Sequence, residues 1–441
     1  MLETTSARSD LLLDAIASIY QWQWYFPQLV KYHITTHCRV NDNQSQSTLA
    51  KKKYISMAHI INRIIDHLYN DKKTLIVCTL VCSEWLPAAR YHLIPSITLH
   101  HRNADRLLRA LKAPFTKLGT SVRTLIITDQ PAHISLDHLN EILPVLASQF
   151  TRLEILVLDG LDWCILDMGW LSSSHTTVFP KLIELQLLGC AFQDLGHLVA
   201  FICAFPKLDT LSVNRCKWDT RVLSTVSPQH HISRRLSDLM LLPAEPGLVN
   251  WLRSQTCRFV DTLYLDDVTR ERIPAVRDFL RHLGPSLLQL RIRFADNIYV
   301  RDVQNANVDL SHNTRLNTLQ IIVSLISLDN TPYKVYFLDW IPAFLAKIAS
   351  THLDTIKFRL LTYNPDLFDL NWREFDRVLA LPVFAKLRQL HFNIADPSTS
   401  PIFVQIDPYD LVEEMELITY QYLPRASARG IIRVTCTVDP N

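Results

Sequence analysis

The stretch Phe179-Pro-Lys-Leu-Ile-Glu-Leu-Gln-Leu187 returns, with the same apolar positions, as Phe205-Pro-Lys-Leu-Asp-Thr-Leu-Ser-Val213. Both contain an apolar frame of the type LxxLxL, whose last two apolar positions alternate with polar residues as in a half-buried strand. A frame that recurs every 20 to 50 residues or so is typical of a solenoid, because one repeat cannot bury its apolar side without a neighbour. This pair of stretches therefore predicts a repeat protein.

Eight further stretches fit the same frame. If the fourth position of each frame is taken as its anchor, the ten anchors follow one another at steps of 24 to 37 residues. One match would carry little weight, but ten in order favour a solenoid over another α/β fold with several buried strands. The anchors are Leu125, Leu156, Leu185, Leu211, Leu239, Leu263, Leu290, Leu319, Ile356 and Leu390.

The segments between the frames have helical spacing. Apolar residues lie three and four apart in 136–146, 195–202, 248–252 and 273–283. Each unit is thus expected to be a strand, a turn and a helix, as in a leucine-rich repeat of irregular length. The predicted fold class is α/β, with parallel strands lining a concave face and helices outside.

Composition argues against several classes of partner. The 441 residues carry 45 basic and 43 acidic side chains, so a net charge of +2 gives no reason to expect nucleic acid or an anionic membrane. Only 8 glycines occur, and no glycine-rich phosphate-binding loop is present. We therefore expect no nucleotide cofactor.

Sequence motifs for catalysis or metal binding are also lacking. His33, His37 and Cys38 have the spacing of ligands on one helical face, but no further ligand follows at a recognisable distance, so no metal is expected. No nucleophile elbow or zinc-protease motif occurs, and the chain is not expected to be an enzyme. A deep polar pocket with converging titratable groups would favour a hydrolase or transferase instead.

The cysteines indicate the compartment. Nine occur without a C-x-x-C pair, and several, such as Cys190, Cys203 and Cys216, stand in apolar frames or helices, where a reduced thiol acts as a small hydrophobe. These features predict a reducing compartment, the cytoplasm or the nucleus.

Three regions follow one another along the chain. Residues 1–53 read as a poorly ordered extension or a short helix, since Asp14 and Pro27 interrupt the apolar run 11–30 that would otherwise suit a membrane. Residues 54–95 read as three short helices, the second capped by Thr74 and the third starting at Ala88. Residues 96–441 read as the solenoid with a C-terminal cap.

The helical region also carries a family resemblance. The stretches His59–Leu68, Leu80–Arg90 and Pro95–Leu99, followed by the repeats, resemble the F-box proteins with leucine-rich repeats of mushroom-forming fungi. The resemblance implies a substrate receptor of an SCF-type ubiquitin ligase, whose F-box binds the adaptor and whose concave face binds a target. It implies adaptor contacts at Met57, Ile60, Val81 and Trp85.

Two alternatives to these assignments stay open. Ile60, Val81 and Trp85 could instead hold the three helices together, since core and interface residues share a composition. The family usually opens with Leu-Pro-x-Glu, whereas this chain has Ser56-Met57-Ala58-His59, which favours an interaction scaffold without ligase coupling.

The residues that flank the buried positions of each strand should form the concave face. The earlier repeats place Asp159, Glu184, Asp238 and Asp266 there, and the later repeats place cations. We expect the later part to bind an acidic or phosphorylated segment of a target, because arginine pairs bidentately with carboxylate and phosphate. The alternative is a solvated face whose charges pair with neighbouring acids. The expected target-binding residues are Tyr264, Arg291, Arg293, Lys357 and Arg359.

Overall fold

The structure is a computed structural model, and two units can be distinguished in it. The first unit comprises Met1–Leu161 and Ile165–Leu182, and the second comprises Asp162–Cys164 and Ile183–Asn441. The expected extension, 1–53, lies outside the described residues. The structure describes residues 57–100, 102–112, 119, 121–128, 136–164, 179–219, 230–255, 259–295, 308–324, 338, 340–361, 370–396 and 408–438.

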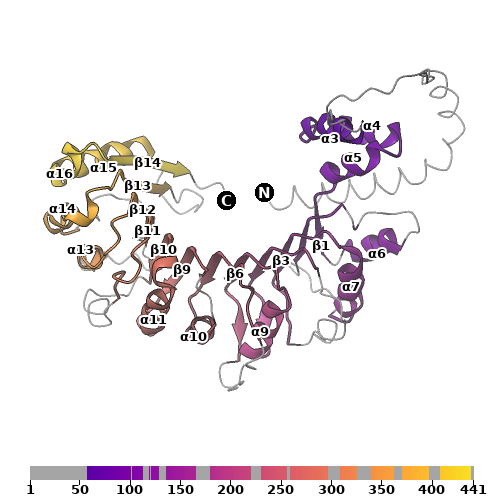
Figure 1. The fold of residues 1–441 in the computed structure, drawn as a ribbon, viewed down its shortest axis with the longest axis horizontal. Coiled ribbons are helices and arrows are strands. Elements are labelled where there is room, and N and C mark those ends of the chain that lie inside the picture. The colour runs from indigo at the N-terminus through magenta and orange to yellow at the C-terminus, as the bar shows by residue number, and fades with distance from the viewer. Residues whose placement is uncertain are drawn as a thin grey trace, which may run out of the picture. The chain divides into compact units, whose positions relative to one another are not determined.

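The described part of the first unit starts with three helices and continues into parallel strands (Figure 1). Strand β1 (Ser96–Leu99) pairs with β2 (Thr124–Thr128), which pairs with β3 (Ile155–Asp159). Two helices, α6 (Ala104–Lys112) and α7 (Leu136–Gln149), lie between these strands in the chain. The three N-terminal helices are α3 (Met57–His67), α4 (Lys72–Val81) and α5 (Trp85–Leu93).

The expected bounds of these helices need correction. Thr74 is not the cap of the second helix: Asp71 is, and its carboxylate accepts hydrogen bonds from Thr74 N at 3.1 Å and Thr74 Oγ1 at 2.6 Å. An Asp at this position accepts from the backbone two or three residues later, which is how an N-cap satisfies an orphan donor. The third helix begins at Trp85, earlier than Ala88.

The described part of the second unit contributes nine parallel strands, paired in chain order, to the large sheet, and two short strands, β5 (Ala191–Phe192) and β7 (Lys217–Trp218), pair with each other separately. Helices lie on one side of this curved sheet, as Figure 1 shows for α10, α11, α13 and α14. This α/β architecture with a large parallel sheet confirms the predicted fold class at that level. The strands are β4 (Glu184–Leu188), β6 (Thr210–Asn214), β8 (Asp238–Leu242), β9 (Thr262–Val268), β10 (Gln289–Phe294), β11 (Thr318–Ser324), β12 (Thr355–Leu361), β13 (Gln389–Asp396) and β14 (Ile432–Val438).

All ten predicted anchors lie in strands and are buried. Within the second unit each anchor pairs in register with the next, from Leu185 with Leu211 to Ile356 with Leu390. Along most of these strands buried residues alternate with more exposed ones, as in β10, where Leu290 and Ile292 are buried and Arg291 and Arg293 are not. The alternation is interrupted by the buried Ser212 in β6 and the buried Ile322 in β11. The period of two in the sequence therefore marks the two faces of the sheet.

A backbone motif joins successive repeats. The carbonyl of Asp209 accepts the amides of both Ser237 and Asp238, at 2.9 and 3.1 Å. In the next repeat, the carbonyl of Ser237 accepts the amides of Asp261 and Thr262, at 3.0 and 3.1 Å. A carbonyl oxygen has two lone pairs and can accept twice, so one group satisfies both amides at the entry to a strand. The same pairing recurs down to Asp354, whose carbonyl accepts from Arg388 and Gln389.

The helices outside the sheet have recognisable ends. Helix α9 (Leu195–Cys203) is capped by Asp194, whose carboxylate accepts from His197 N at 2.8 Å. Helix α11 (Ile273–Leu283) ends at Gly284, whose φ of 52° few other residues adopt. Proline stands in the first turn of α10 (Pro246–Ser254) and of α11, where no backbone donor is needed. The remaining helices are α13 (Trp340–Leu345), α14 (Trp372–Leu379), α15 (Pro408–Tyr422) and α16 (Pro424–Ala428).

The two faces of strand β8 give a test of this core. Replacing the buried Leu239 with alanine should lower the free energy of unfolding by about 3 kcal/mol, because the lost methyl groups leave a cavity. Met240, the next residue, is 36% exposed, and Met240→Ala should cost less than about 1 kcal/mol. Urea unfolding followed by circular dichroism measures both. Equal losses would contradict the assignment of the two faces.

Candidate functional sites

Helix α4 exposes an apolar stripe. Its sequence is apolar on nearly every side, so burying Leu75 and Cys78 against the other helices leaves the opposite side uncovered. Val77 is 60% exposed, Leu80 57% and Val81 41%. Spacings of three and four residues place these three side chains on one face of the helix. We call Val77, Leu80 and Val81 the α4 stripe.

The exposure is concentrated in this part of the chain. Eleven large hydrophobic side chains are exposed among the described residues, and five of them lie in the short helical region between Ile64 and Val81. Scattered single residues of this kind are normal on a surface, but these five lie close together in the chain, on α3, on α4 and in the turn between them. Ile64 on α3, at 46%, and Tyr69 after it, at 59%, complete the set.

Polar contacts hold these helices to one another and to the strands of the first unit. His92 Nε2 on α5 lies 2.8 Å from Asp66 Oδ1 on α3. The guanidinium of Arg123, just before β2, lies over the ring of Tyr91 on α5, 4.2 Å from its centroid. A cation at this distance is attracted to the face of the ring. The α4 stripe is thus presented by a helical group that is fixed to a sheet.

The predicted adaptor contacts are placed only in part. Val81 belongs to the α4 stripe and is too exposed to act as a core residue. Trp85 is half-buried at the start of α5. Met57 and Ile60 lie in α3, but their side chains are outside the described residues. Sequence reasoning missed Val77 and Leu80, although the uninterrupted apolar run 75–78 signals a helix with no polar face.

In the second unit, the candidate site is the half-exposed face of the sheet. Tyr264 on β9 and Arg291 on β10 are direct neighbours in the register. The guanidinium of Arg291 lies 4.1 Å from the centroid of the Tyr264 ring. Burial raises the pKa of the Tyr264 hydroxyl above its usual value, so this side chain is neutral. Two predicted target-binding residues therefore contact each other.

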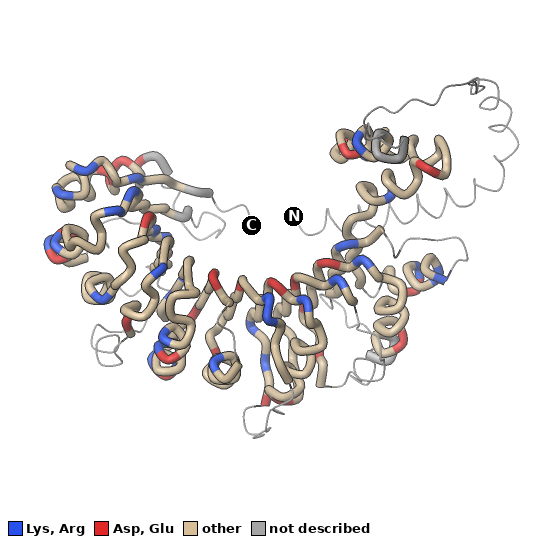
Figure 2. Tube along the Cα trace, in the orientation of Figure 1, with Lys and Arg blue, Asp and Glu red and all other residues tan. Residues whose placement is uncertain are grey.

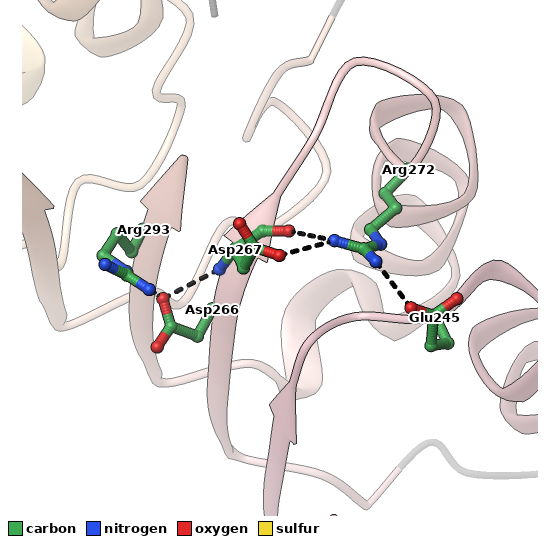
Figure 3. Close-up of polar contacts among 5 residues, drawn as sticks. All are labelled: Glu245, Asp266, Asp267, Arg272 and Arg293. Carbon is green, nitrogen blue, oxygen red and sulfur yellow. Dashed lines mark hydrogen bonds and ion pairs between the residues drawn. The ribbon is translucent and has the colours of Figure 1, made fainter. Parts of the chain in front are cut away.

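Arg293, another of the predicted cations, is paired with an acid. Its Nε donates to Asp266 Oδ1, and that oxygen also accepts from Asp267 N at 2.8 Å (Figure 3). At Arg293, therefore, the structure agrees with the alternative expectation that the charges of this face pair with neighbouring acids. Strand β9 carries one extra residue relative to β10 here, and Asp267 has a φ of 50°, as in a β-bulge.

Arg272 holds the bulge in place. Its Nη1 donates to Asp267 O at 2.8 Å and Asp267 Oδ2 at 2.7 Å, and its Nη2 donates to Glu245 Oε1 at 2.6 Å (Figure 3). Glu245 precedes α10 and Arg272 precedes α11, so one guanidinium joins the entries of two helices. The planar fork of arginine suits several acceptors at once.

The charge of the face changes along the second unit. Glu184, Asp238 and Asp266 lie on β4, β8 and β9, as expected for the acidic part. Basic residues occur on the later strands, in the C-terminal part of the tube in Figure 2. Among them, Lys357 and Arg359 alternate with buried residues of β12. Sequence reasoning missed Arg433 on β14, because that strand was not anticipated. His391 on β13 lies between Lys357 and Arg433 in the register.

A pocket of about 300 Å³ lies beside the C-terminal end of α14 and helix α16. Its two charged side chains are Arg425 and Arg429. Arg429 Nη2 donates to the carbonyls of Phe384 and Leu387, both at 2.9 Å, so it is a structural group. No described group of three His, Cys, Asp or Glu residues could hold a metal ion, and no described helix is long and apolar enough to cross a bilayer.

The Arg272 contacts can be compared with an exposed ion pair. Arg272→Ala should lower the free energy of unfolding by about 2 kcal/mol, since it leaves half-buried acceptors without their donor. The control is Arg377→Ala, which removes an exposed pair with Glu374 within one helical turn and should have no measurable effect. Chemical denaturation measures both, and an Arg272→Ala protein as stable as the control would contradict a structural role.

Comparison with known proteins does not assign a function to these surfaces. No protein-family model matches the chain, and no curated protein matches it either. A function therefore has to be argued from the α4 stripe and from the charged face of the second unit.

Proposed function

We propose that the protein is a non-enzymatic substrate receptor of an SCF-type ubiquitin ligase, in which helices α3–α5 bind the adaptor and the charged sheet face binds a target protein. The observation that carries the proposal is the α4 stripe, because three large apolar side chains stand exposed on a small helical group. Interfaces between proteins are built around such apolar centres. Because residues 54–95 resemble an F-box, the SCF adaptor is the proposed partner of the α4 stripe.

The mechanism is one of proximity. A chain that holds the ligase with one surface and a target with another makes ubiquitin transfer effectively intramolecular, so the local concentration of target rises without new chemistry. The catalytic groups belong to the partners. The extended parallel sheet suits this role, since each strand adds a few half-exposed side chains to one continuous face.

The cysteines support an intracellular setting for this proposal. All seven described cysteines are reduced thiols: Cys78, Cys82, Cys164, Cys190, Cys203, Cys216 and Cys436. Cys190 and Cys216 are buried in apolar surroundings, and a hydrogen bond between the two thiols together with burial raises the pKa of Cys216. Such thiols are unreactive. Cytoplasm or nucleus is the compartment that suits unpaired cysteines.

A second candidate function is an interaction scaffold without ligase coupling. The sequence favours it at one point, where Ser56-Met57-Ala58-His59 replaces the usual Leu-Pro-x-Glu opening of an F-box. In that case the charged face would still bind a target, while the α4 stripe would bind some other apolar partner.

Adaptor binding separates the two candidates. The full chain should bind the purified SCF adaptor with a Kd in the micromolar range or below, and Leu80→Glu should weaken binding at least about tenfold, because it places a charge in an apolar contact. Biolayer interferometry measures both. The matched control is Ile183→Glu, a similar change at a 43% exposed side chain of the second unit, which should bind as the wild type does.

Two outcomes would go against the receptor. If the wild type shows no adaptor binding at about 10 μM, the scaffold is favoured. If Ile183→Glu loses binding as fully as Leu80→Glu, the contact does not involve the α4 stripe. Because Leu80 is exposed, its variant should melt at the wild-type temperature, which excludes unfolding as the cause.

A further inference from the structure

Three basic residues occupy adjacent positions on the last three strands. Lys357 on β12 is the register neighbour of His391 on β13, and His391 is the register neighbour of Arg433 on β14. Neighbouring strands lie about 4.8 Å apart, so side chains at one register position on the same face can converge on a single ligand group. No carboxylate among the described residues forms an ion pair with Lys357 or Arg433.

This arrangement sets the three apart from the neighbouring cations. Arg293 is neutralised by Asp266, and Arg291 lies against the ring of Tyr264. Arg293 is therefore compensated by an acid, whereas Arg291 keeps its charge and packs against a ring.

Hydrogen bonds orient the ring of His391. His391 Nε2 and Thr435 Oγ1 lie 2.7 Å apart, within hydrogen-bond distance. Thr435 Oγ1 also lies 3.3 Å from Asn393 Oδ1, to which it can donate. Once the imidazole is protonated, both of its nitrogens are donors, and Nε2 then donates to the Thr435 hydroxyl oxygen.

The surroundings of His391 oppose that charge in the absence of a ligand. Burial, Arg433 on one side and Lys357 on the other lower the pKa of the imidazole below its usual value. The side chains hydrogen-bonded next to it, Thr435 and Asn393, are uncharged. An anion bound between Lys357 and Arg433 would reverse this effect and raise the pKa.

We propose that Lys357, His391 and Arg433 form a binding site for a phosphorylated side chain of a target protein, and that binding is coupled to the uptake of a proton by the imidazole of His391. A phosphate monoester carries a charge of about −2 and three acceptor oxygens, which matches two fixed cations and one inducible cation. A carboxylate carries a single negative charge, so it would leave part of the positive charge of Lys357, His391 and Arg433 unbalanced. The inference rests on the proposed function because it specifies the class of target.

Fluorescence anisotropy with a labelled heptapeptide tests the site. The peptide has a central phosphoserine flanked by alanines, and two companions carry serine or glutamate instead. The full chain should bind the phosphoserine peptide at least about tenfold more tightly than the glutamate peptide, and Lys357→Gln and Arg433→Gln should each weaken it about tenfold. Arg373→Gln, which removes the same charge from an exposed site on α14, should leave affinity unchanged.

The proton coupling has its own readout. The affinity ratio of wild type to His391→Asn should increase as the pH falls from about 8 to about 6.5, because only the wild type gains a cation on binding. The titration of the phosphate itself cancels in this ratio. A ratio independent of pH would overturn the proton coupling.

The remaining outcomes are equally decisive. Equal binding of the serine and phosphoserine peptides, or unchanged binding after Lys357→Gln and Arg433→Gln, would overturn the site. Inorganic phosphate should compete only at much higher concentration; competition at the concentration of the peptide would assign the site to free phosphate and overturn a protein target. Adaptor binding is measured on the same preparations, so a failed anion site with intact adaptor binding leaves the receptor proposal standing.

Discussion

The carbonyl group that accepts two amides from the next repeat is the contact on which the sheet depends. Asp209, Ser237 and Asp261 each use their carbonyl in this way, and each thereby sets where the following strand begins. A buried amide without a partner costs more than a hydrogen bond contributes, so the start of a strand is strongly determined. Once the start is set, the period of two assigns every side chain to the core or to the exposed face.

Much of this fold could be predicted from the sequence, and the exceptions have physical causes. The ten anchors were found because each lies in a strand that has apolar residues at both inward positions and a further one before it. Strands β1 and β14 were missed. Strand β14 follows a turn at Arg429 and Gly430, whose φ is 65°, and alternates Ile432, Val434 and Cys436 with polar residues but lacks the leading leucine of the frame.

The candidate sites were less predictable because they depend on contacts between repeats. Sequence alternation placed Arg291 and Arg293 on the exposed face, but the bulge at Asp267 decides that Arg293 meets an acid. In the helical region the apolar residues were recognised, yet only packing divides Leu75, which is buried, from Leu80, which is not. The spacing of apolar residues identifies one face of a helix or strand. Whether that face is buried or exposed depends on the chain segments that pack beside it.

The unequal length of the repeats has a further consequence. Leu239 and Leu263 are 24 residues apart and Leu319 and Ile356 are 37 apart, yet both pairs are register neighbours. All the variation is absorbed outside the sheet, and the inner side chains occupy a grid whose columns are the strands. Outer loops can therefore lengthen or shorten without displacing a neighbouring column. The binding specificity of this face can therefore change through the side chains of a single strand, for example by exchanging that strand between related chains.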